Sequence, residues 1–385
     1  MLSNLCKTPF PYFGGKSDAA PYVWNALGDP HHYLEPFAGS LAVLLRRPHP
    51  ANRTHYSETI NDADGLLINV WRSIQWSPGE TAKYASWPVT EADLHARHIA
   101  LLKWRNEHQL EHLMGDYKFH DPEMAGFWIW GNSCWIGSGF CSGDGAWTVD
   151  PQGRLIKGKS TVGISRQISH LGGVGKGVNN PCARELGIAR QIPRLSDGGT
   201  GVNNPCVRTL GTQNEDNVFH PMTSSEVLRW FQFLSARLRN VRIINGDWTR
   251  CVTHGVIHDI DMRKNPEAFA GIFLDPPYDE DIRHAGVYTH DGSTQAIDTH
   301  KWCIENGANP QYRIVLAGYD TEHTELENYG WTAIEWFKAG YMKGGMAMTS
   351  SKGQNQQHRE RLWLSPNCIK NEETNTLDAI FAEED

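Results

Sequence analysis

The sequence lacks long apolar runs and paired-cysteine motifs. No stretch approaches the roughly 18 to 20 uninterrupted apolar residues of a transmembrane helix. Residues 1–10 also lack the apolar core of a signal peptide, so we expect a cytoplasmic protein with no membrane partner. The 8 cysteines are scattered without a CxxC pair. This spacing argues against a disulfide framework or a zinc ribbon, and we expect no bound metal.

The sequence also lacks the positive net charge expected of a protein that binds polyanions. Its formal charge is -8, but the charge is unevenly distributed. Residues 151–215 contain nine Lys or Arg against three acids, a local balance of +6, whereas residues 371–385 contain six acids and no base. The middle region is therefore suited to a polyanion, and the acidic end is expected to be a solvated tail.

Four short apolar segments each end at a loop with unusual residues. They cover residues 32–34, 241–244, 271–274 and 312–317 and are followed by loops that start at Glu35, Asn245, Asp275 and Gly318. Buried strands with polar groups at their ends are typical of an open α/β sheet, whose ligands bind beyond the carboxyl edge. Residues 64–74 have apolar side chains at helical spacing and are expected to cover this sheet. The region from about residue 71 to 225 interrupts the sheet-forming parts.

An internal repeat lies inside the interrupting region. The sequence GISRQI at 163–168 recurs as GIARQI at 187–192, and GVNNPC at 177–182 recurs at 201–206, both with an offset of 24 residues. Two copies are too few for a solenoid, so we expect paired loops or hairpins. The Arg and Gln side chains beside Gly and Asn could contact phosphates and base edges. A duplicated surface segment without a contact role is the alternative.

The strongest chemical signal is Asp275-Pro276-Pro277-Tyr278, directly after an apolar segment. An exocyclic amino nitrogen is a poor nucleophile because its lone pair is delocalised into the ring. The Asp275 carboxylate and the Pro276 carbonyl could accept both amino hydrogens and draw the nitrogen towards tetrahedral geometry. Two prolines stiffen the loop and lack N–H donors, and Tyr278 offers a flat face to an extruded base.

The order of these motifs resembles the Dam-like family of adenine-specific DNA methyltransferases, in the alpha arrangement found in bacteriophages and prophages. The resemblance covers about residues 9–75 and 225–364. It implies an α/β class, Rossmann-like S-adenosylmethionine-dependent methyltransferase fold with an inserted target-recognition domain, and S-adenosyl-L-methionine as cofactor. The expected domains are 1–70 with 226–370 for catalysis, 71–225 for DNA binding, and 371–385 as the acidic tail.

The resemblance also implies roles for single residues. Asp275, Pro276, Pro277 and Tyr278 form the catalytic loop. The cofactor residues are Tyr12, Phe13, Gly14, Lys16, Glu35, Pro36, Phe37, Gly39, Ser40, Asp62, Asp247, Trp248 and Asp275. Within this set, Asp62 is expected to hold the ribose hydroxyls and Asp247 to contact the cofactor's adenine. Ser40 and Leu41 depart from the family, whose members often carry further glycines there.

Contacts with DNA are expected mainly from the inserted region. The candidates are Lys16, Asn132, Arg166, Gln167, Lys176, Arg190, Gln191 and Arg194. Lys16 could neutralise a DNA phosphate or the cofactor carboxylate, or it could be an ordinary solvated lysine. The aromatic stretch at 127–136 is interpreted chiefly as core of the insert, with stacking on bases as the alternative.

Together these features predict methyl transfer to the amino group of a flipped adenine, at specific sites in double-stranded DNA, by a monomer or weak dimer. The amino group of cytosine is an alternative target, because the geometry at the nitrogen is the same. A DNA-binding protein that keeps the fold without turnover is the alternative from another class. The expected context is a bacteriophage or a restriction-modification system, in which a cognate restriction endonuclease would be a further partner.

Overall fold

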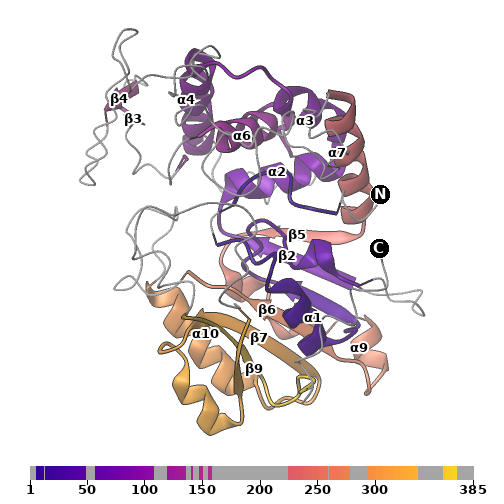
Figure 1. Cartoon of the computed structure of the whole chain (residues 1–385). Coiled ribbons are helices and arrows are strands. Elements are labelled where there is room, and N and C mark those ends of the chain that lie inside the picture. Colours follow the sequence, from indigo (N-terminus) through magenta and orange to yellow (C-terminus); the bar gives the residue numbers. More distant parts are fainter. Residues whose placement is uncertain are drawn as a thin grey trace, which may run out of the picture.

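The computed structural model describes most of the chain outside the basic insert. The described residues are 6–12, 14–48, 57–107, 119–135, 140–141, 147–150, 155–157, 224–258, 260–277, 293–336 and 359–370. They form a sheet domain and a helical lobe, which lie one above the other in Figure 1. The repeat predicted at 163–206 and the tail predicted at 371–385 lie outside the described residues.

The sheet domain is built on a 7-stranded sheet with the order β5-β2-β1-β6-β7-β9-β8 (Figure 1). Its strands are β1 (His32–Glu35), β2 (Ser57–Asp62), β5 (Val241–Asn245), β6 (Ala270–Leu274), β7 (Tyr312–Tyr319), β8 (Thr332–Glu335) and β9 (Glu360–Leu364). The first five strands in the sheet order pair in parallel, and β9 runs antiparallel to both neighbours. The predicted α/β class with an open, Rossmann-like sheet is confirmed.

The strand order places one crevice at the middle of the sheet. From β1 the chain moves outward to β2 on one side and later returns to β6 on the other side. The loops after β1, β2 and β6 therefore meet beyond the carboxyl ends of these strands. In open α/β sheets, ligands bind at this type of switch point.

Most of the predicted strands are found where the sequence places them. Segments 32–34, 241–244 and 271–274 lie within β1, β5 and β6. The prediction for β7 was too short, because Gly318 and Tyr319, expected in a loop, pair with Arg361 and Glu360 of β9. The partner strand comes much later in the chain, so no local pattern indicates this pairing.

Two apolar layers cover the sheet. Helices α1 (Ala20–Leu27) and α2 (Gly65–Trp76) pack on one face, together with Phe273 and Val315. The other face carries η6 (Trp248–Arg250), α8 (His254–Ile257), α9 (Ile260–Lys264), α10 (Ser293–Asn306) and η7 (Thr324–Tyr329). Successive strand residues point to opposite faces, so a strand covered on both sides is apolar throughout, as β6 is.

Helix α2 belongs to both parts of the molecule. Asp64 caps its first turn by accepting the N–H of Leu66 at 2.9 Å, so the helix predicted at 64–74 is confirmed. One end of α2 packs on the sheet domain through β2 and β5, and it also contacts helices of the lobe. The domain boundary predicted between residues 70 and 71 lies inside this helix; the division into domains remains a prediction.

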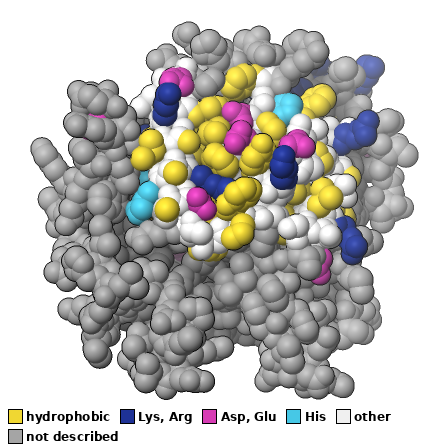
Figure 2. Space-filling model, turned by 90° about the horizontal axis from the view of Figure 1, so that it is seen from above, with side chains coloured by type: hydrophobic (Ala, Val, Ile, Leu, Met, Phe, Trp, Pro, Cys, Tyr) yellow, Lys and Arg dark blue, Asp and Glu magenta, His cyan; other side chains and the backbone are white. Residues whose placement is uncertain are grey.

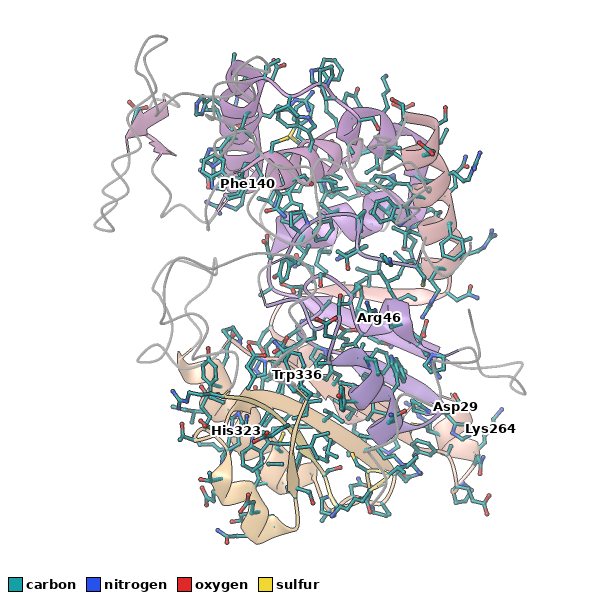
Figure 3. All side chains as sticks on the ribbon, in the orientation of Figure 1. Asp29, Arg46, Phe140, Lys264, His323 and Trp336 are labelled. Carbon is teal, nitrogen blue, oxygen red and sulfur yellow. The ribbon has the colours of Figure 1, made fainter. Side chains whose placement is uncertain are left out.

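The helical lobe consists of α3 (Pro78–Ala85), α4 (Glu91–Glu107), α6 (Pro122–Cys134) and α7 (Ser224–Leu238), packed on α2. In α6, the side chains of Trp128 and Trp130 are 5% and 0% exposed. Trp128 meets Phe10 edge-on at 4.9 Å, and Phe140 (Figure 3) packs against Trp135. The tryptophans of α6 are therefore core of the lobe, as the sequence interpretation favoured.

A buried ion pair joins the lobe to the sheet. Arg237 of α7 contacts both carboxylate oxygens of Glu58 in β2, at 2.6 and 2.8 Å. Arg47 reaches the same carboxylate at 3.1 Å. Because a two-pronged guanidinium–carboxylate contact fixes both distance and angle, this pair orients α7 on the edge of the sheet domain.

The face of the molecule shown in Figure 2 mixes hydrophobic, acidic and basic side chains. A 2-stranded antiparallel sheet of β3 (Trp147–Val149) and β4 (Leu155–Lys157) belongs to the insert. Residues 155–157 are the described part of the basic region at 151–215. Among the helices described, none combines the length and apolar content needed to cross a membrane.

Candidate active site

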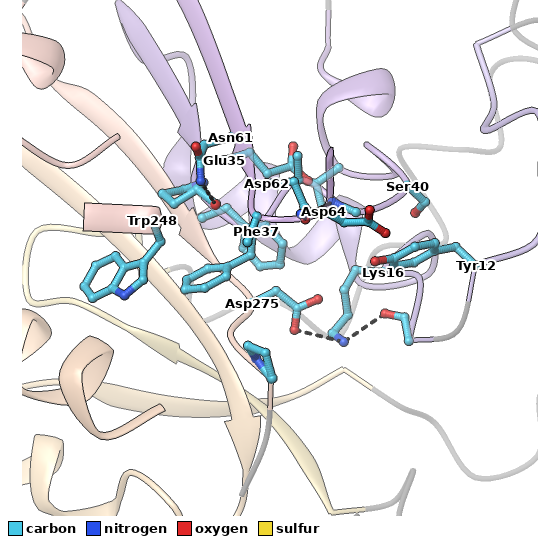
Figure 4. Close-up of a pocket in the computed structure, with 18 of the residues that line it drawn as sticks. Tyr12, Lys16, Glu35, Phe37, Ser40, Asn61, Asp62, Asp64, Trp248 and Asp275 are labelled. Carbon is cyan, nitrogen blue, oxygen red and sulfur yellow. Dashed lines mark hydrogen bonds and ion pairs between the residues drawn. The ribbon is translucent and has the colours of Figure 1, made fainter. Parts of the chain in front are cut away.

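Several segments meet in one pocket at the carboxyl edge of the sheet (Figure 4). They are the N-terminal segment at 12–16, the loops that follow β1, β2, β5 and β6, and Gln295 of α10. The pocket measures about 850 Å³ when its open mouth is included. The predicted residues in its lining are Tyr12, Gly14, Lys16, Glu35, Pro36, Phe37, Gly39, Ser40, Asp62, Trp248, Asp275 and Pro277.

The loop after β1 turns tightly at Gly39. This residue has a φ of 46°, in the left-handed region that favours glycine. A Cβ atom at Gly39 would lie only 2.9 Å from the Tyr12 ring, so the loop and the N-terminal segment can approach closely only without a side chain here. The carbonyl of Gly39 also accepts the indole N–H of Trp71 at 3.0 Å, which fixes the turn against α2.

Leu41 adopts the same unusual backbone conformation without being a glycine. Its φ is 54°, and its side chain is 0% exposed in the core of the sheet domain. A left-handed conformation costs a side-chain-bearing residue about 1–2 kcal/mol, which burial of the leucine offsets. Leu41, at a position where the family often carries a further glycine, therefore adds a core contact.

Asp62, at the end of β2, holds two parts of the pocket together. Its Oδ2 accepts the N–H of Gly39 at 2.9 Å, and its Oδ1 accepts the N–H of Asp64 at 2.9 Å. Burial raises the pKa of Asp62 to about 6, although these backbone hydrogen bonds oppose the shift. Each carboxylate oxygen can accept more than one hydrogen bond. The ribose contact predicted for Asp62 is thus compatible with its structural role.

Glu35, the last residue of β1, is buried at the base of the pocket. Its Oε2 accepts the Tyr33 hydroxyl at 3.1 Å and the N–H of Leu44 at 3.2 Å. Burial raises the pKa of Glu35 to about 8, and the nearby carboxylates of Asp275 and Glu58 add to the shift. The carboxyl group of Glu35 is therefore mostly protonated at neutral pH.

An aromatic wall closes one side of the pocket. The rings of Phe37 and Trp248 lie 5.8 Å apart at 27°, and Trp302 braces Trp248 edge-on at 6.3 Å. Asp247, the neighbouring predicted residue, does not belong to the lining found for this pocket. Its carboxylate instead caps η6 by accepting the N–H of Thr249 at 2.9 Å. The adenine contact predicted for Asp247 remains a prediction.

Asp275 enters the pocket directly after β6 (Figure 4). Its Oδ1 lies 3.1 Å from the ammonium of Lys16, which also donates to the Gly14 carbonyl at 3.0 Å. Lys16 is only 5% exposed, so it is not the solvated lysine considered as an alternative. Pro276 is buried beside Asp275, and Pro277 contributes to the lining. Tyr278 lies outside the described residues, as does Phe13.

Comparison with known families decides between the remaining interpretations. Residues 12–95 match the model of the D12 class N6 adenine-specific DNA methyltransferases. The match covers residues 12–95 of a chain of 385 residues, and over this stretch the chain is similar to these enzymes. A search of curated proteins found no match to the sequence. The match favours an S-adenosylmethionine-dependent enzyme that acts on adenine in DNA over cytosine transfer or DNA binding without turnover.

The matched stretch contains three of the segments that form the pocket. It includes the N-terminal segment, the loop after β1 and the end of β2, and it stops before the lobe is complete. Asp275 and Pro277, from the predicted catalytic loop, lie beyond the match and line the same pocket. The match and the fold thus support the site from independent parts of the chain.

The pocket fits S-adenosylmethionine in charge and shape. A sulfonium cofactor with an amino group carries positive charge, and the lining presents Asp62, Asp64 and Asp275 against the single amine of Lys16. The wall formed by Phe37 and Trp248 offers a flat surface suited to an adenine ring. These residues would hold the nucleoside end of the cofactor between the loops after β1 and β2.

Several lining residues were missed from the sequence. They are Gly15, Ala38, Ala42, Val43, Asn61, Ala63, Asp64, Gly246, Phe273 and Gln295. Asn61 donates to the carbonyls of Pro36 and Gly246, both at 3.0 Å, and so ties the loops after β1 and β5 together. Its position next to Asp62 was an available signal. Gln295 comes from α10, and no sequence pattern near it indicates a site.

The predicted DNA contacts divide into two groups. Asn132 lies in the described lobe, where its side-chain amide donates to the Pro11 carbonyl at 2.6 Å. This bond anchors the N-terminal cofactor segment to α6; the DNA contact predicted for Asn132 remains a prediction. Lys16 faces Asp275 inside the pocket. The remaining candidates, Arg166, Gln167, Lys176, Arg190, Gln191 and Arg194, lie outside the described residues.

Proposed function

We propose that this methyltransferase acts at specific sites in double-stranded DNA, on an adenine flipped out of the helix, with Asp275-Pro276-Pro277-Tyr278 as its catalytic loop. The observation that carries the proposal is the position of Asp275. Its carboxylate lines the same pocket as Phe37, Gly39 and Asp62, although these residues lie far from it in the chain. An acceptor beside the cofactor loops is what transfer to an amino group requires.

The chemistry follows from the acceptors at the exit of β6. The Asp275 carboxylate and the Pro276 carbonyl accept hydrogen bonds from the target amine and draw its lone pair out of conjugation. Proline has no N–H to compete for these acceptors, and its fixed φ keeps the carbonyls in place. S-adenosylmethionine supplies an electrophilic methyl group when bound. No covalent intermediate with the protein is needed, which agrees with the burial of Cys251 and Cys303.

Lys16 orients the Asp275 carboxylate. Its ammonium lies 3.1 Å from Oδ1. Because the contact to the Gly14 carbonyl fixes the same ammonium, the N-terminal segment and the catalytic loop are held in register. A bound cofactor would then meet a preformed acceptor.

The insert at 71–225 is the proposed DNA-binding part. Its basic stretch at 151–215 supplies charge for phosphate contacts, and the Arg and Gln side chains of the repeat are candidates for reading base edges. We further propose a role in a bacteriophage or in a restriction-modification system. The contacts of the helical lobe support a DNA-binding insert that is joined to the sheet domain. Asn132 of α6 donates to the Pro11 carbonyl, and Arg237 of α7 pairs with Glu58 of β2.

The decisive experiment replaces Asp275 with Asn, which keeps the shape of the side chain and removes its charge. We expect methylation to fall by about 10²–10³-fold, as for loss of other preorganised polar groups, while cofactor affinity changes little. Methylated DNA is digested to nucleosides and N6-methyladenine is quantified by mass spectrometry. Asp298→Asn, an exposed acid on α10, is the matched control. Unchanged turnover in Asp275→Asn contradicts the proposed catalytic role.

A further inference from the structure

A second carboxylate approaches the Lys16–Asp275 pair from strand β9, which is separated from β6 by β7 alone. Glu360 is the first residue of β9, opposite Tyr319 at the end of β7. Its Oε2 lies 4.0 Å from the Lys16 ammonium, and its side chain is only 15% exposed. The proposed mechanism gives Glu360 no part. Its position nevertheless connects the last strand of the sheet with the catalytic loop.

The charges around Glu360 couple it to both members of the pair. Burial raises the pKa of Glu360, Lys16 lowers it, and the carboxylates of Asp275 and Glu322 raise it. Burial also raises the pKa of the Tyr319 hydroxyl to about 12, with Glu360 as the next cause. These groups therefore form one buried cluster in which a single ammonium faces several acidic side chains.

We propose that Glu360 is a positioning residue for methyl transfer, which acts by holding the Lys16 ammonium against Asp275. This inference rests on the catalytic role proposed for Asp275. A lysine ammonium is a compact charge with three donors at the end of a flexible stem, so one partner cannot fix its direction. Here acceptors from three segments surround it: the Gly14 carbonyl, Asp275 after β6, and Glu360 of β9.

The test compares Glu360→Gln with the wild-type enzyme under single-turnover conditions. We expect the rate constant of methyl transfer to fall about tenfold, the equivalent of about 1.4 kcal/mol. The cofactor concentration that gives half the maximal rate should change little. Glu360→Asp, which keeps the charge, should restore part of the rate. The matched control is Glu335→Gln. It removes the exposed carboxylate of Glu335 in β8, which pairs with Arg361 of β9.

A double-mutant cycle with Lys16→Met tests whether Glu360 acts through the lysine. We expect Glu360→Gln to change the rate little in the Lys16→Met background, because the group it positions is gone. An equal loss in both backgrounds, or no recovery of rate in Glu360→Asp, overturns the inference. If Asp275→Asn is inactive while Glu360→Gln matches Glu335→Gln, only this inference fails; if Asp275→Asn is active, the proposed catalytic loop fails with it.

Discussion

Replacement of Glu35 by Gln should change how the stability of the protein depends on pH. Glu35 is 2% exposed at the base of the pocket and accepts hydrogen bonds from Tyr33 and Leu44. Burial raises its pKa from 4.5 to about 8. Gln keeps the shape of the side chain and an oxygen acceptor for both donors, but it cannot ionise. The variant therefore removes one titration and little else.

The size of the effect follows from the shift in pKa. The folded protein holds the Glu35 proton more tightly than the unfolded chain does. The free energy of unfolding of the wild type thus falls as pH rises between the unfolded pKa of 4.5 and the folded pKa of about 8. The slope inside this window is about 1.4 kcal/mol per pH unit. Between about pH 5.5 and about pH 7.5 the wild type should lose about 3 kcal/mol through this group.

Urea unfolding, followed by tryptophan fluorescence at several pH values in this window, measures the difference. The free energy of unfolding of Glu35→Gln should gain on that of the wild type by about 1.4 kcal/mol for each pH unit. Other titrating groups are common to both proteins and cancel. Glu327→Gln, an exposed acid in η7, serves as the control and should run parallel to the wild type. Parallel curves for Glu35→Gln would refute the reasoning.

Three further predictions concern the pocket loop, the joint between the two parts, and the insert. Gly39→Ala should weaken cofactor binding by about tenfold, because φ is positive at Gly39 and the added Cβ would lie against the Tyr12 ring. Calorimetry measures the affinity, and Gly255→Ala, where a Cβ would meet open space, is the control. Arg237→Met should lower the free energy of unfolding by about 3 kcal/mol, since Glu58 loses a buried two-pronged partner; no change in urea midpoint contradicts this. Removing residues 160–210 should weaken DNA binding and site choice while cofactor binding persists, and retained specificity in sequenced DNA would count against a reading role.

The sequence alone indicated strands β1, β5, β6 and most of β7, and the main loops of the pocket. A strand covered on both faces must be apolar along its length, so β6 could be recognised from residues 271–274 without any partner. The polar or glycine residues that follow such strands lie at the carboxyl edge, where parallel strands bring their loops together. Asp275 was predicted for this reason and Asp62 from the family resemblance, and both line one pocket.

Only the tertiary structure decided which side chains face Asp275. The Lys16 ammonium contacts it from the N-terminal segment, Glu360 approaches from the last strand, and Gln295 enters the lining from α10. These residues lie far apart in the chain, so no periodicity or spacing relates them. Apolar patterns are imposed locally by burial, whereas contacts between charged groups depend on how the strands are ordered. The sequence thus determined the central strands and the polar edge of the sheet, and the order of the strands decided the electrostatic surroundings of the Asp275 carboxylate.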